Sequence, residues 1–242
     1  MKGDNQYNYV GSELYLFENA INWKFYLKSI IRKHFKNPVL EVGAGLGGTT
    51  KVFCDNNFEW YCLEPDDELL EKLKHKIIQK ELPGSCHSLC GTINNIPIEM
   101  KFGTILYVDV LEHIEKDEIE LLNAYGRLRD GGNLIVIAPA HSFLMSPFDN
   151  AIGHFRRYTK KGLNEIVPAN MQLLFLGYLD SCGMIASLIN KIFLRNELPS
   201  KAQIFFWDRV MVRISRVVDR ILFFNIGKSV LGVWRKNGET GH

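Results

Sequence analysis

Three closely spaced glycines mark the first segment of the chain that could do chemistry. Gly43, Gly45 and Gly48 form the pattern GxGxxG directly after the short apolar stretch 39–42. Because glycine has no side chain, backbone N–H groups in such a loop can approach a bound ligand closely. The pattern alone is weak evidence, since a tight strand-to-helix connection uses the same residues.

An acidic residue follows the loop at the spacing that is typical of nucleotide-binding folds. Glu64 ends the next apolar stretch, roughly 20 residues further along the chain. A carboxylate at that point can accept hydrogen bonds from both ribose hydroxyls of a nucleotide. The alternative is an exposed acid that caps the following helix. The combination of loop and acid predicts a nucleoside pocket, which NAD and S-adenosylmethionine would both fit.

Two further features favour S-adenosylmethionine over NAD. Glu41 lies two residues before the first glycine, where a carboxylate can hold the cationic methionyl amine, whereas a pyrophosphate would gain nothing from that charge. A short-chain dehydrogenase of this length would carry a Tyr-x-x-x-Lys pair. Tyr158 is instead followed by Thr159, Lys160, Lys161 and Gly162, so the lysine is out of register.

Four short motifs extend the argument, and they occur in a fixed order. They are Leu-Glu-Val-Gly-Ala-Gly-Leu-Gly at 40–47, Leu-Glu-Pro-Asp at 63–66, Asp-Val-Leu-Glu-His-Ile at 109–114 and Arg-Asp-Gly-Gly at 129–132. Through them the chain resembles the class I S-adenosylmethionine-dependent methyltransferases from about residue 15 to residue 236. The resemblance implies a Rossmann-like α/β fold with a seven-stranded, mostly parallel sheet and an antiparallel last strand.

The same resemblance implies how the cofactor is held. Glu41, Gly43 and Gly45 would contact its methionine end, and Glu64 would bind the ribose. The family usually has Gly-Asp after the third strand, with the Asp at adenine, but this chain has Gly91-Thr92, so a hydroxyl or backbone group would replace the carboxylate. The expected cofactor residues are Glu41, Gly43, Ala44, Gly45, Glu64, Pro65, Gly91, Thr92, Asp109 and Val110. The expected product is S-adenosylhomocysteine.

Two histidines are candidates for a general base. The sulfonium already makes its methyl group electrophilic, so the protein mainly has to align the acceptor and exclude water. A base would assist a hydroxyl acceptor, and histidine titrates in the right range. His113 follows the fourth expected strand and His154 lies in the loop after the fifth. For His113 the alternative is a residue that starts a helix and shapes the pocket floor.

The segment around His154 also supplies candidate substrate ligands. Arg156 and Arg157 offer paired donors that suit a phosphate or a carboxylate. The structural alternative is that one of them pairs with Asp149 or Glu165. The predicted substrate-binding residues are His141, Arg156, Arg157 and Tyr158, although packing is the simpler role for the first and the last.

The nature of the acceptor is only partly constrained. Enzymes that methylate exocyclic or amide nitrogen carry an Asn/Asp-Pro-Pro-Tyr/Phe motif after the fourth strand, and this chain has none. We therefore expect O-methylation of a small molecule such as a sugar, a glycan precursor or a specialised metabolite, with a basic sugar amine as the remaining nitrogen acceptor. The alternatives are a protein or RNA methyltransferase, or a cofactor-binding partner protein without catalysis.

The elements that must position these residues alternate between strand and helix. Expected strands lie at 39–42, 60–63, 87–90, 102–109, 133–138, 172–178 and 229–236, and expected helices at 12–35, 49–55, 66–80, 117–128 and from residue 160. Gly131-Gly132 would close the helix at 117–128. Strands that alternate with helices imply a parallel sheet with right-handed crossovers. The polar and aromatic connection 139–159 would lie over the functional edge.

The expected organisation is a single domain over residues 1–242. It comprises an N-terminal cap helix at 1–37, a cofactor-binding core at 38–180, a helical insertion at 181–228 and the last strand at 229–236. Arginines recur at helical steps in the insertion, beside a row of apolar residues. The insertion either lies on an anionic membrane surface or guides a phosphate-bearing substrate, or it is a packing helix with a solvated basic face.

Net charge, cysteine content and the lack of long apolar runs narrow the classes of function that remain. The net charge of +2 is too small to indicate a nucleic-acid binder. Five cysteines without paired Cys-x-x-Cys spacing predict a reduced, cytoplasmic protein without a metal. Neither a secretory signal nor an apolar run long enough to span a bilayer is expected, so membrane contact would be peripheral. The partner would be a small-molecule substrate, and the oligomeric state stays open.

Overall fold

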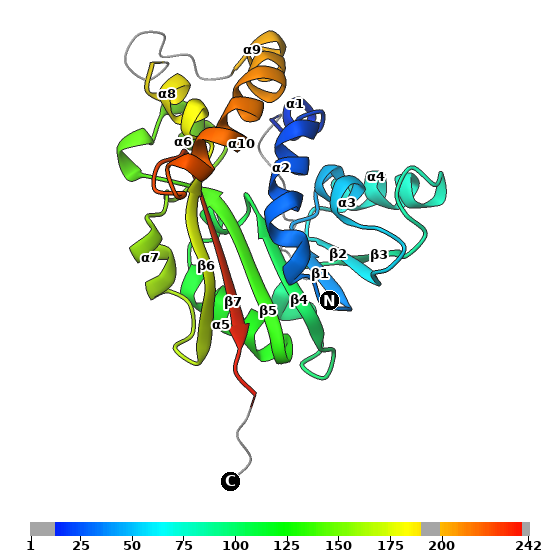
Figure 1. The fold of residues 1–242 in the computed structure, drawn as a ribbon. Helices are drawn as coiled ribbons and strands as arrows, with labels where there is room; N and C mark the ends of the chain where they lie inside the picture. Colours follow the sequence, from blue (N-terminus) through cyan, green and yellow to red (C-terminus); the bar gives the residue numbers. More distant parts are fainter. Residues whose placement is uncertain (1–12, 190–198, 239–242) are drawn as a thin grey trace.

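The computed structural model describes residues 13–189 and 199–238, and its centre is one seven-stranded sheet (Figure 1). The strands follow the order β3-β2-β1-β4-β5-β7-β6. β7 pairs antiparallel with β5 and β6, while the other pairings are parallel, so the predicted topology is confirmed. The strands are β1 Val39–Val42, β2 Trp60–Glu64, β3 Cys86–Cys90, β4 Phe102–Val108, β5 Leu128–Pro139, β6 Met171–Leu179 and β7 Ser229–Lys236.

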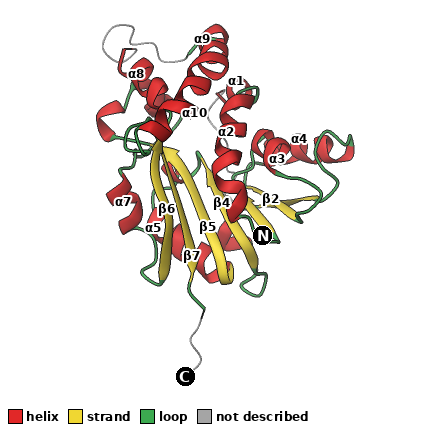
Figure 2. Cartoon of the chain, in the orientation of Figure 1, coloured by secondary structure: helices red, strands yellow, loops and turns green. Residues whose placement is uncertain are grey.

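Helices cover both faces of the sheet (Figure 2). Those before β5 are α1 Glu13–Phe17, α2 Ile21–Ile31, η1 Arg32–His34, α3 Gly48–Phe53, α4 Asp67–Ile78, η2 Ile93–Asn95, η3 Leu111–His113 and α5 Asp117–Arg127. Those after β5 are η4 Ser142–Leu144, α6 Pro147–Ala151, α7 Lys160–Glu165, α8 Ser181–Ile189, α9 Lys201–Phe206, the π-helix η6 Trp207–Met211 and α10 Val212–Ile221.

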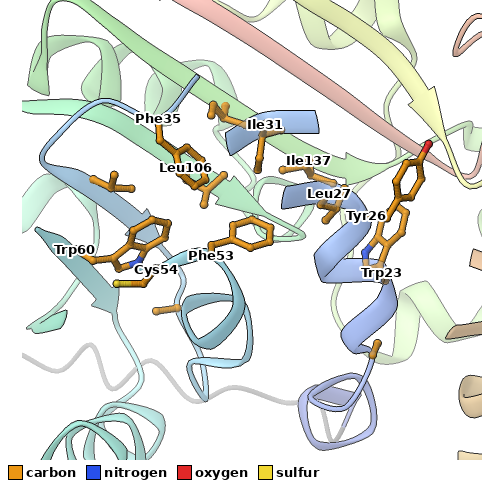
Figure 3. Packing of buried hydrophobic residues seen from close by; sticks show 14 of the residues in the cluster. Trp23, Tyr26, Leu27, Ile31, Phe35, Phe53, Cys54, Trp60, Leu106 and Ile137 are labelled. Atoms are coloured by element: carbon orange, nitrogen blue, oxygen red, sulfur yellow. The ribbon is translucent and has the colours of Figure 1, made fainter. Parts of the chain in front are cut away.

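Two apolar clusters form the core, one on each side of the sheet. On one side, Leu27 and Ile31 from α2 and Phe53 from α3 pack against Trp60 and Leu106, as Figure 3 shows. On the other side, α5 and α7 contribute Leu121, Ala124 and Leu163. Burying these side chains fixes each helix against the sheet, so the loops at the carboxyl ends of the strands have a rigid support.

The expected N-terminal helix at 12–35 is wrong in one respect, because it is divided. α1 ends at Phe17 and α2 begins at Ile21. The carboxylate of Asp208, far along the chain, accepts hydrogen bonds from the backbone N–H groups of Asn22 (3.2 Å) and Trp23 (2.9 Å). A buried carboxylate at this point satisfies N–H groups that a new helix N-terminus leaves open. Residues 1–12 of the predicted cap helix lie outside the described residues.

The expected boundary between helix and strand at 128–133 is also corrected. The helix ends at Arg127, and β5 already begins at Leu128, so Gly131 and Gly132 lie inside the strand. The pairing with β4 shifts from Phe102↔Leu128 to Thr104↔Asn133, and Gly131 has a φ of +70°. The glycines therefore form a bulge rather than a helix cap.

The predicted helical insertion is present between β6 and β7, in α8, α9, η6 and α10, although its residues 190–198 lie outside the described part. These helices gather beyond the carboxyl ends of the parallel strands, on the same side as α1 (Figure 1). None of the helices in the described part of the chain combines the length and apolar character that crossing a bilayer requires.

Candidate active site

The glycine loop after β1 needs glycine at three positions. Gly43, Gly45 and Gly47 have φ values of +67°, +53° and +75°, which L-residues rarely adopt. A Cβ on Gly43 would lie 2.6 Å from a methyl group of Val110. The third glycine with left-handed backbone is Gly47 rather than Gly48, because Gly48 is already the first residue of α3.

Glu64 connects the loops after β1 and β2. Its carboxylate accepts hydrogen bonds from the N–H of Gly45 (2.7 Å) and the N–H of Asp66 (3.0 Å). Burial raises the pKa of this carboxyl, although both hydrogen bonds oppose the shift. Each carboxylate oxygen accepts one of these bonds and has a second lone pair, so Glu64 keeps the capacity to bind two hydroxyls.

Glu41 on β1 is buried below the glycine loop. Its carboxylate accepts hydrogen bonds from the hydroxyl of Thr50 (2.7 Å) and the indole N–H of Trp60 (2.8 Å). Burial raises its pKa to about 7, against the effect of these two bonds and of the nearby Lys24. The carboxyl group therefore changes charge near neutrality.

Lys24 is a candidate site residue beside the glycine loop that the sequence reasoning missed. It is buried on α2, where its ammonium donates hydrogen bonds to the backbone carbonyls of Phe17 (2.7 Å) and Glu18 (2.8 Å). Burial lowers its pKa to about 8, although Asp208, Glu18, Asp109 and Glu41 oppose that shift. A signal was present, because Lys24 lies four residues after Ala20 and three before Leu27, on the buried face of the helix.

The helix α1 covers the glycine loop. Leu14 lies 3.6 Å from the position that a Cβ on Gly45 would take. Lys72 of α4 donates to the hydroxyl of Tyr15 (2.8 Å), while Lys76 pairs with Glu18 and donates to the carbonyl of Leu46 (3.0 Å). These contacts hold the N-terminal segment over the carboxyl edge of the sheet.

The remaining predicted cofactor residues line the same edge. The N–H of Ala44 donates to the carbonyl of Leu63 (3.1 Å), beside the half-buried Pro65. Gly91 has a φ of +117°, and a Cβ there would lie 2.5 Å from the side-chain oxygen of Asn95. Thr92 caps η2, and its hydroxyl contacts the same oxygen at 3.1 Å. The carboxyl edge therefore brings together the loops after β1, β2 and β3.

Asp109 follows β4 in a left-handed conformation, with a φ of +53°. Asp109 is exposed to solvent. Many protein atoms nevertheless surround its carboxyl group, and the resulting loss of hydration raises the pKa of that group. We refer to the surroundings of this carboxyl group as the Asp109 region. His154, Lys228, Lys24 and Arg157 all oppose the pKa shift of Asp109, so the Asp109 region has cations as well as acids near it.

His154 lies between two carboxyl groups. Its Nδ1 is 2.9 Å from Asp149, and its Nε2 is 3.7 Å from Glu112. Although burial opposes the shift, hydrogen bonds from His154 and Arg157 hold the pKa of Asp149 well below its usual range. An ionised Asp149 fixes the orientation of the imidazole and would stabilise its protonated form.

His113 packs against His154, with the two ring centroids 4.6 Å apart. Burial and the neighbouring His154 lower the pKa of His113 to about 4, although hydrogen bonds with the backbone of Gly153 and Ile152 oppose the shift. His113 is therefore neutral at pH 7, and its ring is held by the connection after β5.

Glu112 completes this cluster and has unusual surroundings. Its carboxyl group is fully buried, and neither oxygen has a hydrogen-bond partner. Burial and the nearby Asp109 raise its pKa well above the ordinary value. Among the described residues, Glu112, His113 and His154 form a group whose ligand atoms lie within 4.8 Å of one another, as a metal site would require. The raised pKa of Glu112 favours its neutral form, which a buried position without a partner tolerates better than a carboxylate.

The predicted substrate ligands hold the connection 139–159 in place. Arg157 forms two hydrogen bonds to Asp149, at 2.9 and 3.0 Å, which is the structural alternative raised by the sequence. Arg156 pairs with Asp117 (2.6 Å), and the hydroxyl of Tyr158 donates to the same carboxylate (2.7 Å). These donors are engaged within the protein, so their role as substrate ligands stays a prediction.

His141 lies at the start of the same connection. It has a φ of +64°, its N–H donates to the carbonyl of Tyr158 (2.9 Å), and its ring centroid is 4.4 Å from that of Tyr178. Burial lowers its pKa. The structure thus separates His141, which contacts β6, from the His113–His154 pair.

The sequence comparison decides the family. Residues 40–136 match the family model described as a methyltransferase domain, and this range includes the loops that follow β1, β2, β3 and β4. The chain therefore carries a methyltransferase domain, in the fold of the class I S-adenosylmethionine-dependent methyltransferases. S-adenosylmethionine is therefore the methyl donor of this methyltransferase. No curated protein matches the sequence.

Solved structures share the fold of this methyltransferase at low identity. A chain in the complex between the Haloferax volcanii Trm112 methyltransferase activator and the putative methyltransferase has a TM-score of 0.62 at 13% identity, with 96% of this chain and 100% of that chain covered. A putative sarcosine dimethylglycine methyltransferase from Galdieria sulphuraria gives 0.60 at 14% identity, covering 89% and 85%. Coclaurine N-methyltransferase bound to N-methylheliamine and SAH gives 0.61 at 11%, covering 90% and 72%.

Proposed function

We propose that this methyltransferase transfers the methyl group of S-adenosylmethionine to a hydroxyl of a small polyhydroxylated acceptor, such as a sugar, a glycan precursor or a specialised metabolite. The observation that carries the proposal is the exposed Asp109 at the carboxyl end of β4, with the imidazole pair His113–His154 on the adjoining segments. A carboxylate accepts hydrogen bonds from neighbouring hydroxyls, and an imidazole can remove the proton that a hydroxyl must lose.

The residues at the carboxyl edge would hold the cofactor from its ribose to its methionyl group. Glu64 would hold the ribose hydroxyls, since it bridges the two loops and retains acceptor capacity. The methionyl group is a zwitterion, and Glu41 and Lys24 lie close enough to shift each other's pKa. Glu41 would hold its ammonium and Lys24 its carboxylate. When bound, the cofactor supplies an electrophilic methyl group attached to a sulfonium.

His154 would act as the general base. Asp149 holds Nδ1, which orients the ring and would stabilise the imidazolium that forms when the acceptor loses its proton. The lowered pKa of His113, about 4, makes it a weaker base than an ordinary imidazole. We assign His113 to packing beside His154.

The pairing of the arginines in the connection 139–159 favours a small acceptor over RNA. Arg156 pairs with Asp117 and Arg157 with Asp149, so both guanidinium groups are engaged before any phosphate of RNA could bind them. The anchored connection 139–159 would also limit access by a folded protein.

A labelling experiment tests the proposal. The protein is incubated with S-adenosylmethionine carrying a ¹³C-methyl group and, separately, with pools of sugars and nucleotide sugars, amines, RNA and unfolded protein. We expect label in the sugar pools, with the chemical shift of an O-methyl group. Label that accumulates on nitrogen, or in RNA or protein, would overturn the proposed acceptor class.

A further inference from the structure

The outer face of the insertion helices carries a row of apolar side chains in solvent. We define the apolar stripe as Phe206, Val210, Ile214, Val217 and Ile221, which follow one another at steps of three or four residues along α9, η6 and α10. Val217 is 60% exposed and Ile221 is 67% exposed. A helix in a globular protein normally turns such a row toward the core, so this helix has the opposite orientation.

The orientation is fixed by acidic residues on the inner face. Asp208 accepts the N–H groups at the start of α2. Asp219 accepts hydrogen bonds from the hydroxyl of Tyr26 (2.9 Å) and the N–H groups of Asp180 (2.7 Å) and Ser181 (3.0 Å). Rotating the helix to bury the apolar stripe would expose these bonds and leave the helix starts without their acceptors.

A row of arginines accompanies the apolar stripe. We define the arginine row as Arg209, Arg213, Arg216 and Arg220, all exposed and spaced three or four residues apart. The acids of residues 199–228 are Asp208 and Asp219, and both are buried. The exposed charge on this segment is therefore entirely positive.

The stripe ends in an exposed aromatic residue. Phe223 is 81% exposed, and both Phe223 and Phe224 have left-handed backbone, with φ values of +50° and +56°. Bulky residues rarely adopt this conformation. Phe224 packs against Phe175, with ring centroids 5.4 Å apart, which holds the turn while Phe223 points outward. Nearby α8, which packs on α10, adds the exposed Ile185 and Ile189.

We propose that this face docks the methyltransferase on an anionic phospholipid bilayer. An apolar row that enters the boundary between headgroups and acyl chains, flanked by arginines at headgroup level, is the arrangement of an interfacial helix. The arginine row is complementary to anionic headgroups. A second copy of the chain is disfavoured, because the same face of a partner would offer no exposed carboxylate from residues 199–228 to pair with the arginines.

Docking in this way would orient the active site. The insertion helices lie beyond the carboxyl ends of the parallel strands, where the cofactor loops and the connection 139–159 also lie (Figure 1). A bilayer against the apolar stripe would therefore be adjacent to the catalytic edge rather than to the opposite end of the sheet. This inference concerns binding and stands whether or not the proposed acceptor is correct.

Vesicle flotation with the full chain tests the inference without any turnover assay. We expect binding to vesicles of phosphatidylcholine mixed with phosphatidylglycerol, and much weaker binding to phosphatidylcholine alone or at high salt. The triple variant Ile214→Ser, Val217→Ser, Ile221→Ser should lose at least about tenfold in partitioning. Replacing Arg213 and Arg216 by Gln should lose roughly fivefold for each arginine.

A matched control uses apolar residues exposed elsewhere. The variant Ile78→Ser, Ile119→Ser, Leu122→Ser changes side chains that are similarly exposed on α4 and α5, and it should bind vesicles like the unchanged chain. Unchanged melting temperatures would show that all variants fold. Absence of binding to the anionic vesicles, or equal binding by the stripe variant, would overturn the proposal. A dimer that forms in ultracentrifugation and that only the stripe variant loses would also overturn the proposal, because the apolar stripe would then bind a second copy of the chain.

Discussion

His154 lies between two carboxyl groups whose pKa values are shifted in opposite directions. Hydrogen bonds from His154 and Arg157 hold the pKa of Asp149 below its usual range against the effect of burial, whereas burial raises the pKa of Glu112 well above its ordinary value. Glu112 lies 3.7 Å from Nε2 of His154, which is beyond hydrogen-bond distance, so Nε2 keeps its lone pair. With Nδ1 held by Asp149, Nε2 is the ring atom that would take the proton of the acceptor.

A substitution at this histidine gives the first prediction. His154→Gln should lower kcat by about 100-fold while leaving the affinity for S-adenosylhomocysteine unchanged, because the base is lost and the cofactor loops are not touched. Steady-state kinetics and calorimetry measure the two quantities. His75→Gln, on an exposed part of α4, is the control. If His154→Gln kept the full kcat and His113→Gln lost it, His113 rather than His154 would be the general base.

The pair of Glu41 and Lys24 gives a prediction about pH. The zwitterion binds best when Glu41 is ionised and Lys24 is protonated. With pKa values of about 7 and about 8, affinity for S-adenosylhomocysteine should decline as pH falls through 7 and as it rises through 8. Calorimetry over this range measures both limbs.

The variant Lys24→Met separates the two limbs of that profile. Lys24→Met should bind S-adenosylhomocysteine more weakly. Its affinity should no longer decline as pH rises through 8, while the decline below pH 7 should remain. Lys51→Met, an exposed change on α3, is the control. An alkaline limb that survives in Lys24→Met would assign it to another group.

At the scale of elements, the connection 139–159 depends on two arginines with different surroundings. Arg157 pairs with the fully buried Asp149, and its side chain is 11% exposed, whereas Arg156 is 34% exposed beside Asp117. Removing the partner of a buried charge costs about 3–5 kcal/mol. The loss should be smaller for Arg156, because Arg156 is itself partly solvated and the buried Asp117 keeps the hydrogen bond from the hydroxyl of Tyr158.

Chemical denaturation of two matched variants measures this difference. Arg157→Met should lower the free energy of unfolding by about 3 kcal/mol and Arg156→Met by about 1 kcal/mol. Equal losses in the two variants would show that the buried carboxylate is not what anchors the connection.

The elements themselves were largely predictable, because apolar periodicity and the glycines after β1 are local signals. The exceptions depend on contacts between distant residues. Asp208, which caps the start of α2, lies 186 positions further along the chain. Gly131 and Gly132 resemble a helix cap in the sequence but form a bulge where β5 pairs with β4. Lys24 was missed for a related reason: a lysine in a helix is read as exposed unless its burial is known.

The candidate site was predictable only in part. Glu64 and the loop glycines follow from spacing, since the carboxyl ends of parallel strands meet at one edge. The sequence could not show that Arg156 and Arg157 are engaged by Asp117 and Asp149, because ion pairs of this kind are set by the folded connection. Nor could it show that the apolar side of α10 faces outward, since periodicity defines a face but not its direction.

At the scale of the whole molecule, the two proposed functions, methyl transfer and membrane docking, share one end of the sheet. The cofactor loops, the connection 139–159 and the insertion helices all lie beyond the carboxyl ends of the parallel strands. The opposite end carries the turns that complete the fold. Substitutions at that end should therefore affect stability without changing cofactor affinity or vesicle binding.

Calorimetric titration of S-adenosylmethionine tests the central claim most directly, which is that Glu64 and the glycine loop hold this cofactor at the carboxyl edge. We predict that the unchanged chain and the exposed control Glu99→Gln bind S-adenosylmethionine equally, that Glu64→Gln binds at least about tenfold more weakly, and that NAD gives no binding. Tighter binding of NAD, or full affinity in a folded Glu64→Gln variant, would contradict the account.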